Sequence, residues 1–271
     1  MMKIKTLVAV AAFAVTGTAF AKIGSPAETA TGGEMSLHIF SQSAEATYQF
    51  DSGVLFNDFN LAALAATPGT PYSWNATLDA ATDTNFASFL ALAGSASDLS
   101  FAFWGGDNNG VTASSRNMVS TVRAGGDAGL ITNGNMVDSM NQMQNYIALV
   151  NGKQPSGVAA NGSSFFTQAE GLGHYFGAGS DKSVMNTKFA IGNDGLVGTT
   201  VKVYSFARSS TSLGGDAIET EIGTFTVNQL NDTQYSVAFS TPSAVPEPTS
   251  MALALVGLGA LGMMARRRRA K

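Results

Sequence analysis

The chain has 271 residues and no cysteine, so it contains no disulfide, zinc–thiolate site, iron–sulfur cluster or thiol nucleophile. Seven of its 15 Lys and Arg residues lie at the two ends, and the body from Lys22 to Ala244 has 8 cations and 18 carboxylates, which gives a net charge of −10. An acidic body with scattered cations has no surface for phosphate backbones, so we expect no nucleic-acid partner. The length allows one large domain or two small ones with a substantial core.

The segment from Met1 to Ala21 predicts a secretory signal peptide. Its parts are the cations Lys3 and Lys5, the apolar run Thr6 to Val15, and the small-x-small cleavage pattern at Ala19 and Ala21. Signal peptidase is therefore an expected partner, and the mature chain is expected to start at Lys22. A buried N-terminal helix is the alternative, although Gly17 would weaken it.

In the body, short runs that alternate large and small residues predict β-strands. The predicted strands are Ser36 to Gln42, Ala46 to Phe50, Leu99 to Trp104, Met118 to Arg123, Lys188 to Ile191, Thr200 to Ala207, Gly223 to Val227 and Gln234 to Ser240. The first two are expected to form a hairpin, and so are the last two, across Asn228 to Thr233. Leu99 to Trp104 has the pattern of a half-buried strand.

Two segments predict helices. Asp83 or Thr84 is a candidate N-cap for a helix that carries Phe86, Phe89, Leu90 and Ala93 on one face and stops at Gly94. Asn133 or Asn135 is a candidate N-cap for a longer helix ending at Gly152, with a stripe of Met136, Met140, Met143, Ile147 and Val150. Three methionines are compatible with a metal site or a flexible binding surface, but a stripe facing the core is favoured.

These elements predict a strand-dominated α+β fold, with an antiparallel or sandwich-like sheet and two or three helices. A parallel doubly wound or barrel architecture is not favoured, because strands and helices do not alternate regularly. The predicted domains are the signal peptide (1–21), the secreted body (22–244) and a C-terminal signal (245–271).

The C-terminal segment has three parts. Val245-Pro246-Glu247-Pro248 is stiff and extended, because each proline fixes its own φ and restricts the residue before it. Met251 to Ala265 is an uncharged run of 15 residues, about 22 Å long as a helix, which alone is short for a membrane span. With Pro248 to Ser250 added on one side and the arginine stems on the other, it is expected to form a short transmembrane helix. Arg266, Arg267, Arg268 and Arg269 follow and are expected to stay in the cytoplasm by the positive-inside rule. The body would then lie on the opposite side of the inner membrane.

This tail resembles the PEP-CTERM sorting signal of Gram-negative bacteria over Val245 to Lys271, with the motif, the apolar run and the arginine cluster in order. The resemblance implies that the tail is recognised in the inner membrane by exosortase and removed as the protein passes to the cell surface or the extracellular matrix. The likeness says nothing of the activity of the body. The physical alternative for the proline segment is an ordinary linker before a tail anchor.

No nucleophile elbow, Walker loop, dinucleotide fingerprint or His-Glu-x-x-His helix occurs, and the sequence names no catalytic residue and no cofactor. The two histidines are His38, in an alternating strand, and His174, in a Gly-rich loop. A Ser-His-Asp set assembled in space is compatible with the sequence. A hydrogen-bonded or exposed histidine without a catalytic role is the default expectation.

Two further patterns indicate weak candidate sites. Asp107, Asn109 and Asp194 lie in Asp/Asn/Gly segments that supply oxygen ligands for calcium, although the same residues are ordinary in turns, which is the favoured interpretation. Four aromatic residues are candidates for stacking on sugars if they share an exposed surface: Tyr72, Trp74, Trp104 and Tyr175. Burial in the core is favoured for Trp104.

Two functions follow. The first is a non-enzymatic surface or matrix protein that is a substrate of exosortase and associates with exopolysaccharide. The alternative is a secreted polysaccharide hydrolase with two carboxylates about 5 to 10 Å apart.

Overall fold

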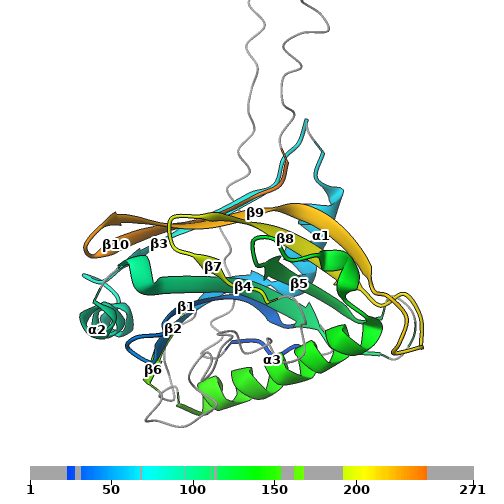
Figure 1. The fold of residues 1–271 in the computed structure, drawn as a ribbon, viewed down its shortest axis with the longest axis horizontal. Helices are drawn as coiled ribbons and strands as arrows, with labels where there is room; N and C mark the ends of the chain where they lie inside the picture. The colour runs from blue at the N-terminus through cyan, green and yellow to red at the C-terminus, as the bar shows by residue number, and fades with distance from the viewer. Residues whose placement is uncertain are drawn as a thin grey trace, which may run out of the picture.

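A computed structural model describes residues 23–27, 32–67, 69–94, 96–110, 112, 115–153, 162–167 and 192–242 (Figure 1). The strands are β1 (Glu34–Ser41), β2 (Ala46–Leu55), β3 (Ser73–Asp79), β4 (Leu99–Asp107), β5 (Asn117–Val122), β6 (Ser163–Thr167), β7 (Gly195–Leu196), β8 (Thr200–Ala207), β9 (Ile218–Asn231) and β10 (Gln234–Ser240). The helices are α1 (Phe56–Ala65), α2 (Thr84–Ala93) and α3 (Asn133–Lys153), with short 3₁₀ turns at Ala96–Asp98 and Ala128–Leu130.

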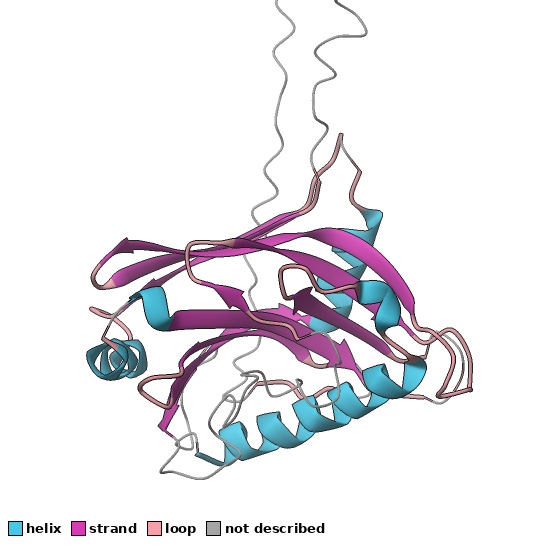
Figure 2. Cartoon of the chain, viewed as in Figure 1, coloured by secondary structure: helices cyan, strands magenta, loops and turns pink. Residues whose placement is uncertain are grey.

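All strands belong to one antiparallel sheet in the order β3-β10-β9-β8-β5-β4-β1-β2-β6, and β7 pairs with the first half of β4. The sheet curves into a half-barrel, so that β8, β9 and β10 lie over β1, β2 and β4 (Figure 2). This confirms the prediction of a strand-dominated antiparallel fold with two or three helices. Among the described residues, no helix is long and apolar enough to span a membrane. The apolar run Met251 to Ala265 lies outside those residues.

The concave face of the sheet holds one of two apolar clusters. Alternate residues of the strands point into it, among them Leu37, Ile39, Phe101 and Phe225. Helices α1 and α2 add Phe56, Phe59, Phe86 and Phe89, all with no exposed surface. Each fully buried Phe contributes about 2 kcal/mol through the hydrophobic effect. The two helices therefore fill the hollow of the half-barrel.

The opposite face of β1, β4, β5 and β8 is covered by α3, which lies below the sheet in Figure 1. The predicted stripe is confirmed, because Met136, Met140, Met143, Ile147 and Val150 are all buried in the second cluster. Both faces of the central strands are thus buried. The expectation of a half-buried strand at Leu99 to Trp104 was wrong, since every residue of that segment is buried. The face of this strand with the small side chains is covered by α3, a helix that comes later in the chain.

The predicted N-cap of α2 is correct, and that of α3 is not. The Asp83 carboxylate accepts hydrogen bonds from the N–H groups of Asn85 and Phe86. At α3, Thr132 and Asn135 bond each other reciprocally, because the N–H of each residue donates to the side-chain oxygen of the other at 3.1 Å. This is the geometry of a capping box, with Thr132 as the N-cap.

Asn133, one of the two predicted caps of α3, has a different role. Its side chain is fully buried and donates to the Ser212 carbonyl at 2.8 Å, while Ser209 N donates to its side-chain oxygen at 3.0 Å. It thereby ties the loop between β8 and β9 to the helix.

Both predicted hairpins are confirmed, with different strand lengths. β1 pairs with β2, and β9 pairs with β10. The strand β9 runs on to Asn231, so the expected loop Asn228 to Thr233 shrinks to the turn at Asp232 and Thr233. The elements α1, β3, β6 and β7 were not predicted. The predicted strand Lys188 to Ile191 lies outside the described residues.

Candidate functional site

The residues of the predicted sorting motif, Val245 to Pro248, lie outside the described part of the chain, as do Arg266 to Arg269 and the cleavage residues Ala19 and Ala21. The described residues nevertheless come close to both signals. They begin at Ile23 and end at Pro242. The surroundings of these two positions show how the body holds each end.

The C-terminal end leaves the body from the end of β10, beside the start of β3. Thr241 is 4 % exposed, and its N–H donates to the Tyr72 carbonyl at 3.0 Å. The Tyr72 N–H donates to the Thr241 hydroxyl at 2.9 Å. Pro242 follows, is exposed, and has no N–H to continue the ladder. The ordered pairing of β3 with β10 therefore stops just before Pro242.

A shallow pocket of about 200 Å³ lies beside this exit. It is lined by the end of α1, by β9 and by the exit itself: Ala63, Leu64, Ala66, Thr220, Glu221, Ile222, Thr241 and Pro242. Its one carboxylate, Glu221, accepts from Lys202 Nζ at 2.7 Å and from the Tyr204 hydroxyl at 3.2 Å. A pair of carboxylates for glycoside hydrolysis is absent from the lining of this pocket.

The N-terminal end is buried against α3. Ile23 is 2 % exposed and belongs to the cluster beneath the sheet. Its N–H donates to the Asn151 side-chain oxygen at 3.0 Å, and Asn151 Nδ2 donates to the Ile23 carbonyl at 2.9 Å. The next N–H, that of Gly24, donates to the Glu34 carboxylate at 2.5 Å. The body thus fixes the residue that directly follows the predicted mature start, Lys22.

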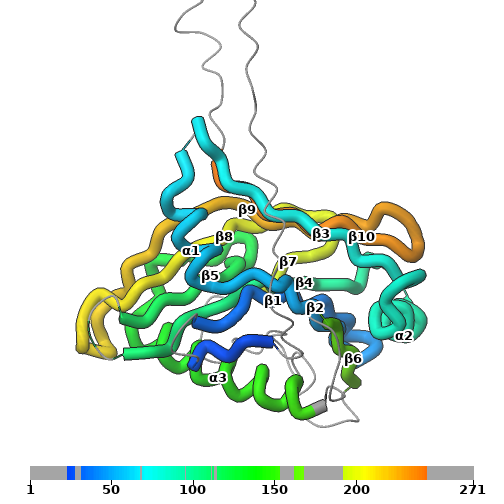
Figure 3. Tube along the Cα trace, turned by 180° about the vertical axis from the view of Figure 1, so that it is seen from behind, coloured from blue at the N-terminus to red at the C-terminus, as the bar shows by residue number. Residues whose placement is uncertain are grey.

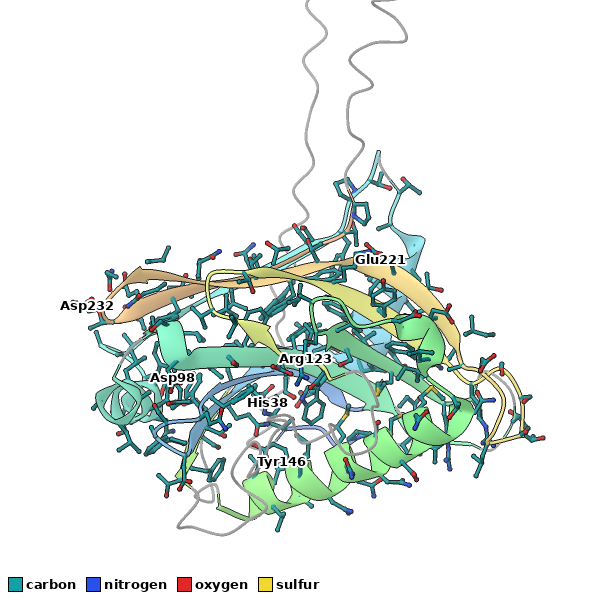
Figure 4. The ribbon with its side chains drawn as sticks, viewed as in Figure 1. His38, Asp98, Arg123, Tyr146, Glu221 and Asp232 are labelled. Carbon is teal, nitrogen blue, oxygen red and sulfur yellow. The ribbon has the colours of Figure 1, made fainter. Side chains whose placement is uncertain are left out.

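His38 is a buried histidine between the sheet and α3 (Figure 4). Its Nε2 lies 3.0 Å from the Ser36 hydroxyl, and its ring stacks on Trp104 with centroids 4.6 Å apart. Tyr146 of α3 approaches the same ring at 5.3 Å. Burial lowers the pKa of the imidazole well below its ordinary value, so the ring stays neutral at physiological pH.

The polar residues around His38 are buried as well. Asp51 lies opposite Ser36 in the pairing of β1 with β2 and accepts from Gly53 N at 2.9 Å. Burial raises the pKa of the Asp51 carboxyl to about 6. Ser36, His38 and Asp51 are at most 2 % exposed, which leaves the Ser36 hydroxyl without access to a polymeric substrate. His174, the other histidine, lies outside the described residues.

The calcium candidates lie at two separate places. Asp107 accepts from the N–H of Asn109 at 2.9 Å, which forms the turn after β4. Asp194 pairs with Arg123 at 2.6 Å. Since Gly195 pairs with Phe101, Asp194 and Asp107 are about five strand residues apart, roughly 17 Å. No group of three or more His, Asp or Glu side chains with metal-ligand spacing occurs within the described ranges.

The four aromatic candidates do not form one exposed surface. Trp104 is 1 % exposed and faces α3, as the core interpretation predicted. Trp74 faces the concave side, where it is partly buried and stacks on Phe103 with centroids 5.6 Å apart. Tyr72 is also partly buried on that side, and Tyr175 lies outside the described residues. A common sugar-stacking platform of Trp74 and Trp104 is therefore ruled out, because the sheet lies between the two rings.

Asp83 joins several elements, a role that the sequence did not indicate. Besides capping α2, its carboxylate accepts from the Tyr48 hydroxyl on β2 and the Ser163 hydroxyl on β6, both at 2.7 Å. The edge strand β3 was not predicted either. The signal for that strand was present, because Trp74, Ala76 and Leu78 alternate with three small polar residues.

Comparison with known proteins identifies one segment of the chain. No curated protein and no solved structure matches the chain. The family model for the PEP-CTERM protein-sorting motif matches residues 244–269, which confirms the resemblance seen in the sequence. The match begins shortly after Pro242, the exposed residue at which the described body ends. The chain therefore carries a PEP-CTERM protein-sorting motif at its C-terminal end, which implies exosortase-dependent sorting to the cell surface.

Proposed function

We propose that the chain is a non-enzymatic surface protein, exported by its signal peptide and trimmed at both ends. Signal peptidase cleaves after Ala21, and exosortase removes the tail near Pro248. Between these steps the protein is a single-pass intermediate held by Met251 to Ala265, with the four arginines in the cytoplasm. The mature body, residues 22–244, then reaches the cell surface or the extracellular matrix.

The observation that carries this proposal is the position of the matched motif relative to the body. The motif starts at residue 244, directly after a strand end that is pinned by Tyr72 and Thr241. An enzyme that binds the stiff Val245 to Pro248 segment would not have to unfold the body, because the ladder has already ended. The buried Ile23 similarly supports a mature chain that begins at Lys22.

We extend the proposal to association with exopolysaccharide. The body has only 26 charged residues, so much of its surface is made of hydroxyl and amide groups that can hydrogen-bond to sugars. Co-sedimentation of the purified protein with exopolysaccharide from the producing strain tests this part. Equal sedimentation with and without the polysaccharide would contradict the extension and leave the sorting proposal intact.

The hydrolase alternative receives no support from the described carboxylates. Asp83, Asp98 and Asp194 are each bonded to donors of neighbouring elements. Asp51, whose pKa is raised, is 2 % exposed and so is closed to a polymeric substrate. An acid–base pair in an open cleft would be required, and the shallow pocket beside the C-terminal exit is lined by a single carboxylate, Glu221.

The test of sorting is a replacement of Pro246, Glu247 and Pro248 by alanine. Export should continue, because it depends on the signal peptide, while tail removal should stop and the uncleaved protein should remain in the membrane fraction. Intact-mass measurement of the membrane, surface and medium fractions distinguishes the forms. The matched control replaces Ser240 by alanine at the exposed end of β10, which leaves the motif unchanged. A triple variant that is trimmed like the wild type would show that the segment is only a linker.

Deletion of Arg266 to Arg269 provides a second arm of the test. The loss of these charges removes the cytoplasmic anchor, and the short apolar run should slip outward before it is processed. We expect an untrimmed protein in the medium, in contrast to the untrimmed membrane form of the triple variant.

A further inference from the structure

The half-barrel has two edge strands, β3 and β6, and they are protected differently. β6 is five residues long and lies against α2, which also contacts β2. β3 is seven residues long and, among the described strands, pairs only with β10, although α2 contacts it as well. Viewed from behind, β3 forms the outer border of the sheet (Figure 3). The side of β3 that faces away from β10 is a row of backbone N–H and C=O groups.

The hydrogen bonds at both ends of β3 show which residues point outward. Tyr72 and Ala80 bond to Thr241 and Thr233 across β10, so the even-numbered residues between them direct their N–H and C=O groups toward β10. The odd-numbered residues Ser73, Asn75 and Thr77 direct theirs away from the sheet. Within the described part of the chain, no hydrogen-bond partner meets these six groups. Their side chains are exposed as well.

This edge lacks the features that keep edge strands from pairing with other chains. It contains no lysine, no proline and no register shift, and its one charge, Asp79, lies at the far end. There the Asp79 carboxylate accepts from Gln234 Nε2 at 2.7 Å, and its carbonyl accepts from Thr82 and Asp83. The stretch Ser73 to Thr77 is neutral in a body of net charge −10. It is therefore a place where two acidic copies can approach without direct repulsion.

We propose that the protein forms a two-fold symmetric dimer in which β3 pairs antiparallel with β3 of a second copy, with Asn75 on the axis. Ser73 then lies opposite the partner's Thr77, and Asn75 lies opposite the partner's Asn75. All three outward-facing residues of each strand are matched, which gives six new backbone hydrogen bonds. Two half-barrels become one continuous sheet.

The side chains of β3 are complementary to themselves in this register. On the exposed face, hydroxyl meets hydroxyl and amide meets amide, and such cross-strand pairs form hydrogen bonds. On the concave face, the partly buried Trp74 lies directly opposite the partner's Ala76, whose small side chain leaves room for the indole. A strongly basic or acidic peptide would find no matching charge on the edge. A second copy is therefore the partner that this strand fits best.

The absence of cysteine from the chain allows a register-specific test in the full-length protein. In Asn75→Cys the two sulfur-bearing residues face each other with Cα atoms about 5.5 Å apart, within the range for a disulfide. Mild oxidation should give a disulfide-linked dimer on a non-reducing gel. In Ser73→Cys the two cysteines are four strand residues apart, about 14 Å, and should not link. Mixing Ser73→Cys with Thr77→Cys should restore the link.

A second variant tests the unlinked protein. Asn75→Lys places two like charges opposite each other on the axis and should weaken the dimer about tenfold or more in analytical ultracentrifugation. Asn228→Lys is the matched control, because Asn228 is exposed on β9, which is not an edge strand and lies between β8 and β10. It should leave the dimer unchanged, and at concentrations low enough for all forms to be monomeric both variants should unfold at the wild-type temperature.

Three outcomes would overturn the proposal. They are a monomeric wild-type protein, linking of Ser73→Cys to the same extent as Asn75→Cys, and a disulfide adduct with a foreign protein in place of the second copy. The proposal does not depend on exopolysaccharide binding or on tail removal, so its failure leaves those proposals standing.

Discussion

The carboxylate of Asp83 is the group whose removal should affect the body most clearly, because it joins three elements. Its Oδ1 accepts from the N–H groups of Asn85 and Phe86 at 2.9 and 3.0 Å and from the Ser163 hydroxyl at 2.7 Å. Its Oδ2 accepts from the Tyr48 hydroxyl at 2.7 Å. Asp83→Ala removes all four bonds and unties α2 from β2 and β6.

The magnitude follows from these contacts. Loss of an N-cap costs about 1 kcal/mol, and a hydrogen bond to a charged group contributes about 1.5 to 3 kcal/mol. The Tyr48 side chain is fully buried, so its hydroxyl loses its partner without access to water. Because losses within one network do not add fully, we expect a decrease of about 3 to 5 kcal/mol in the free energy of unfolding.

Urea unfolding of residues 22–244, followed by circular dichroism, measures this difference. This stretch contains every described element, and we expect it to fold on its own with a β-dominated spectrum. The control is Asp127→Ala, since Asp127 also caps a turn but accepts only from Gly129 N, at 3.0 Å, on the surface. It should lose less than about 1 kcal/mol. Equal losses in the two variants would refute the view that Asp83 joins the elements.

Three other predictions concern stability. Met140→Asp should destabilise the body by several kcal/mol, because it buries an unpaired charge between α3 and Gly106; unchanged thermal unfolding would contradict this. Gly223→Ala should lower the free energy of unfolding in urea by about 1 to 3 kcal/mol, since a Cβ there would collide with the Ser240 carbonyl. Gly214→Ala is the control and should lower it little, because a Cβ at that position meets open space. The Asp51 carboxyl has a folded-state pKa of about 6, above its unfolded value, so the folded body binds this proton more tightly than the unfolded chain does. The free energy of unfolding should therefore fall as pH rises from about 4 to 6. Melting curves across that interval should show this slope in the wild type and a smaller one in Asp51→Asn.

Parts of the fold could be read from local patterns. The stripe of α3 and the Asp83 cap of α2 are signals within a single turn or a few turns of helix, so neighbours in the sequence suffice to predict them. The hairpins β1–β2 and β9–β10 join strands that follow one another directly. The sorting motif is also local. It combines proline geometry, an apolar run and an arginine cluster in one short continuous segment, and none of these needs a tertiary partner to be recognised.

The tertiary structure decided how distant segments pair and which surfaces are covered. β3 pairs with β10, the last strand of the body, and β1 pairs with β4 across the intervening β2, α1, β3 and α2. Such pairings depend on the whole sheet, so the sequence did not indicate that β4 is buried on both faces or that β3 is an edge. The same dependence explains His38, for which the sequence was compatible with a hydrogen-bonded or an exposed ring, and which is buried between the sheet and α3. Local periodicity specifies an element and its faces, whereas the packing of the other elements determines which of those faces and edges stay free.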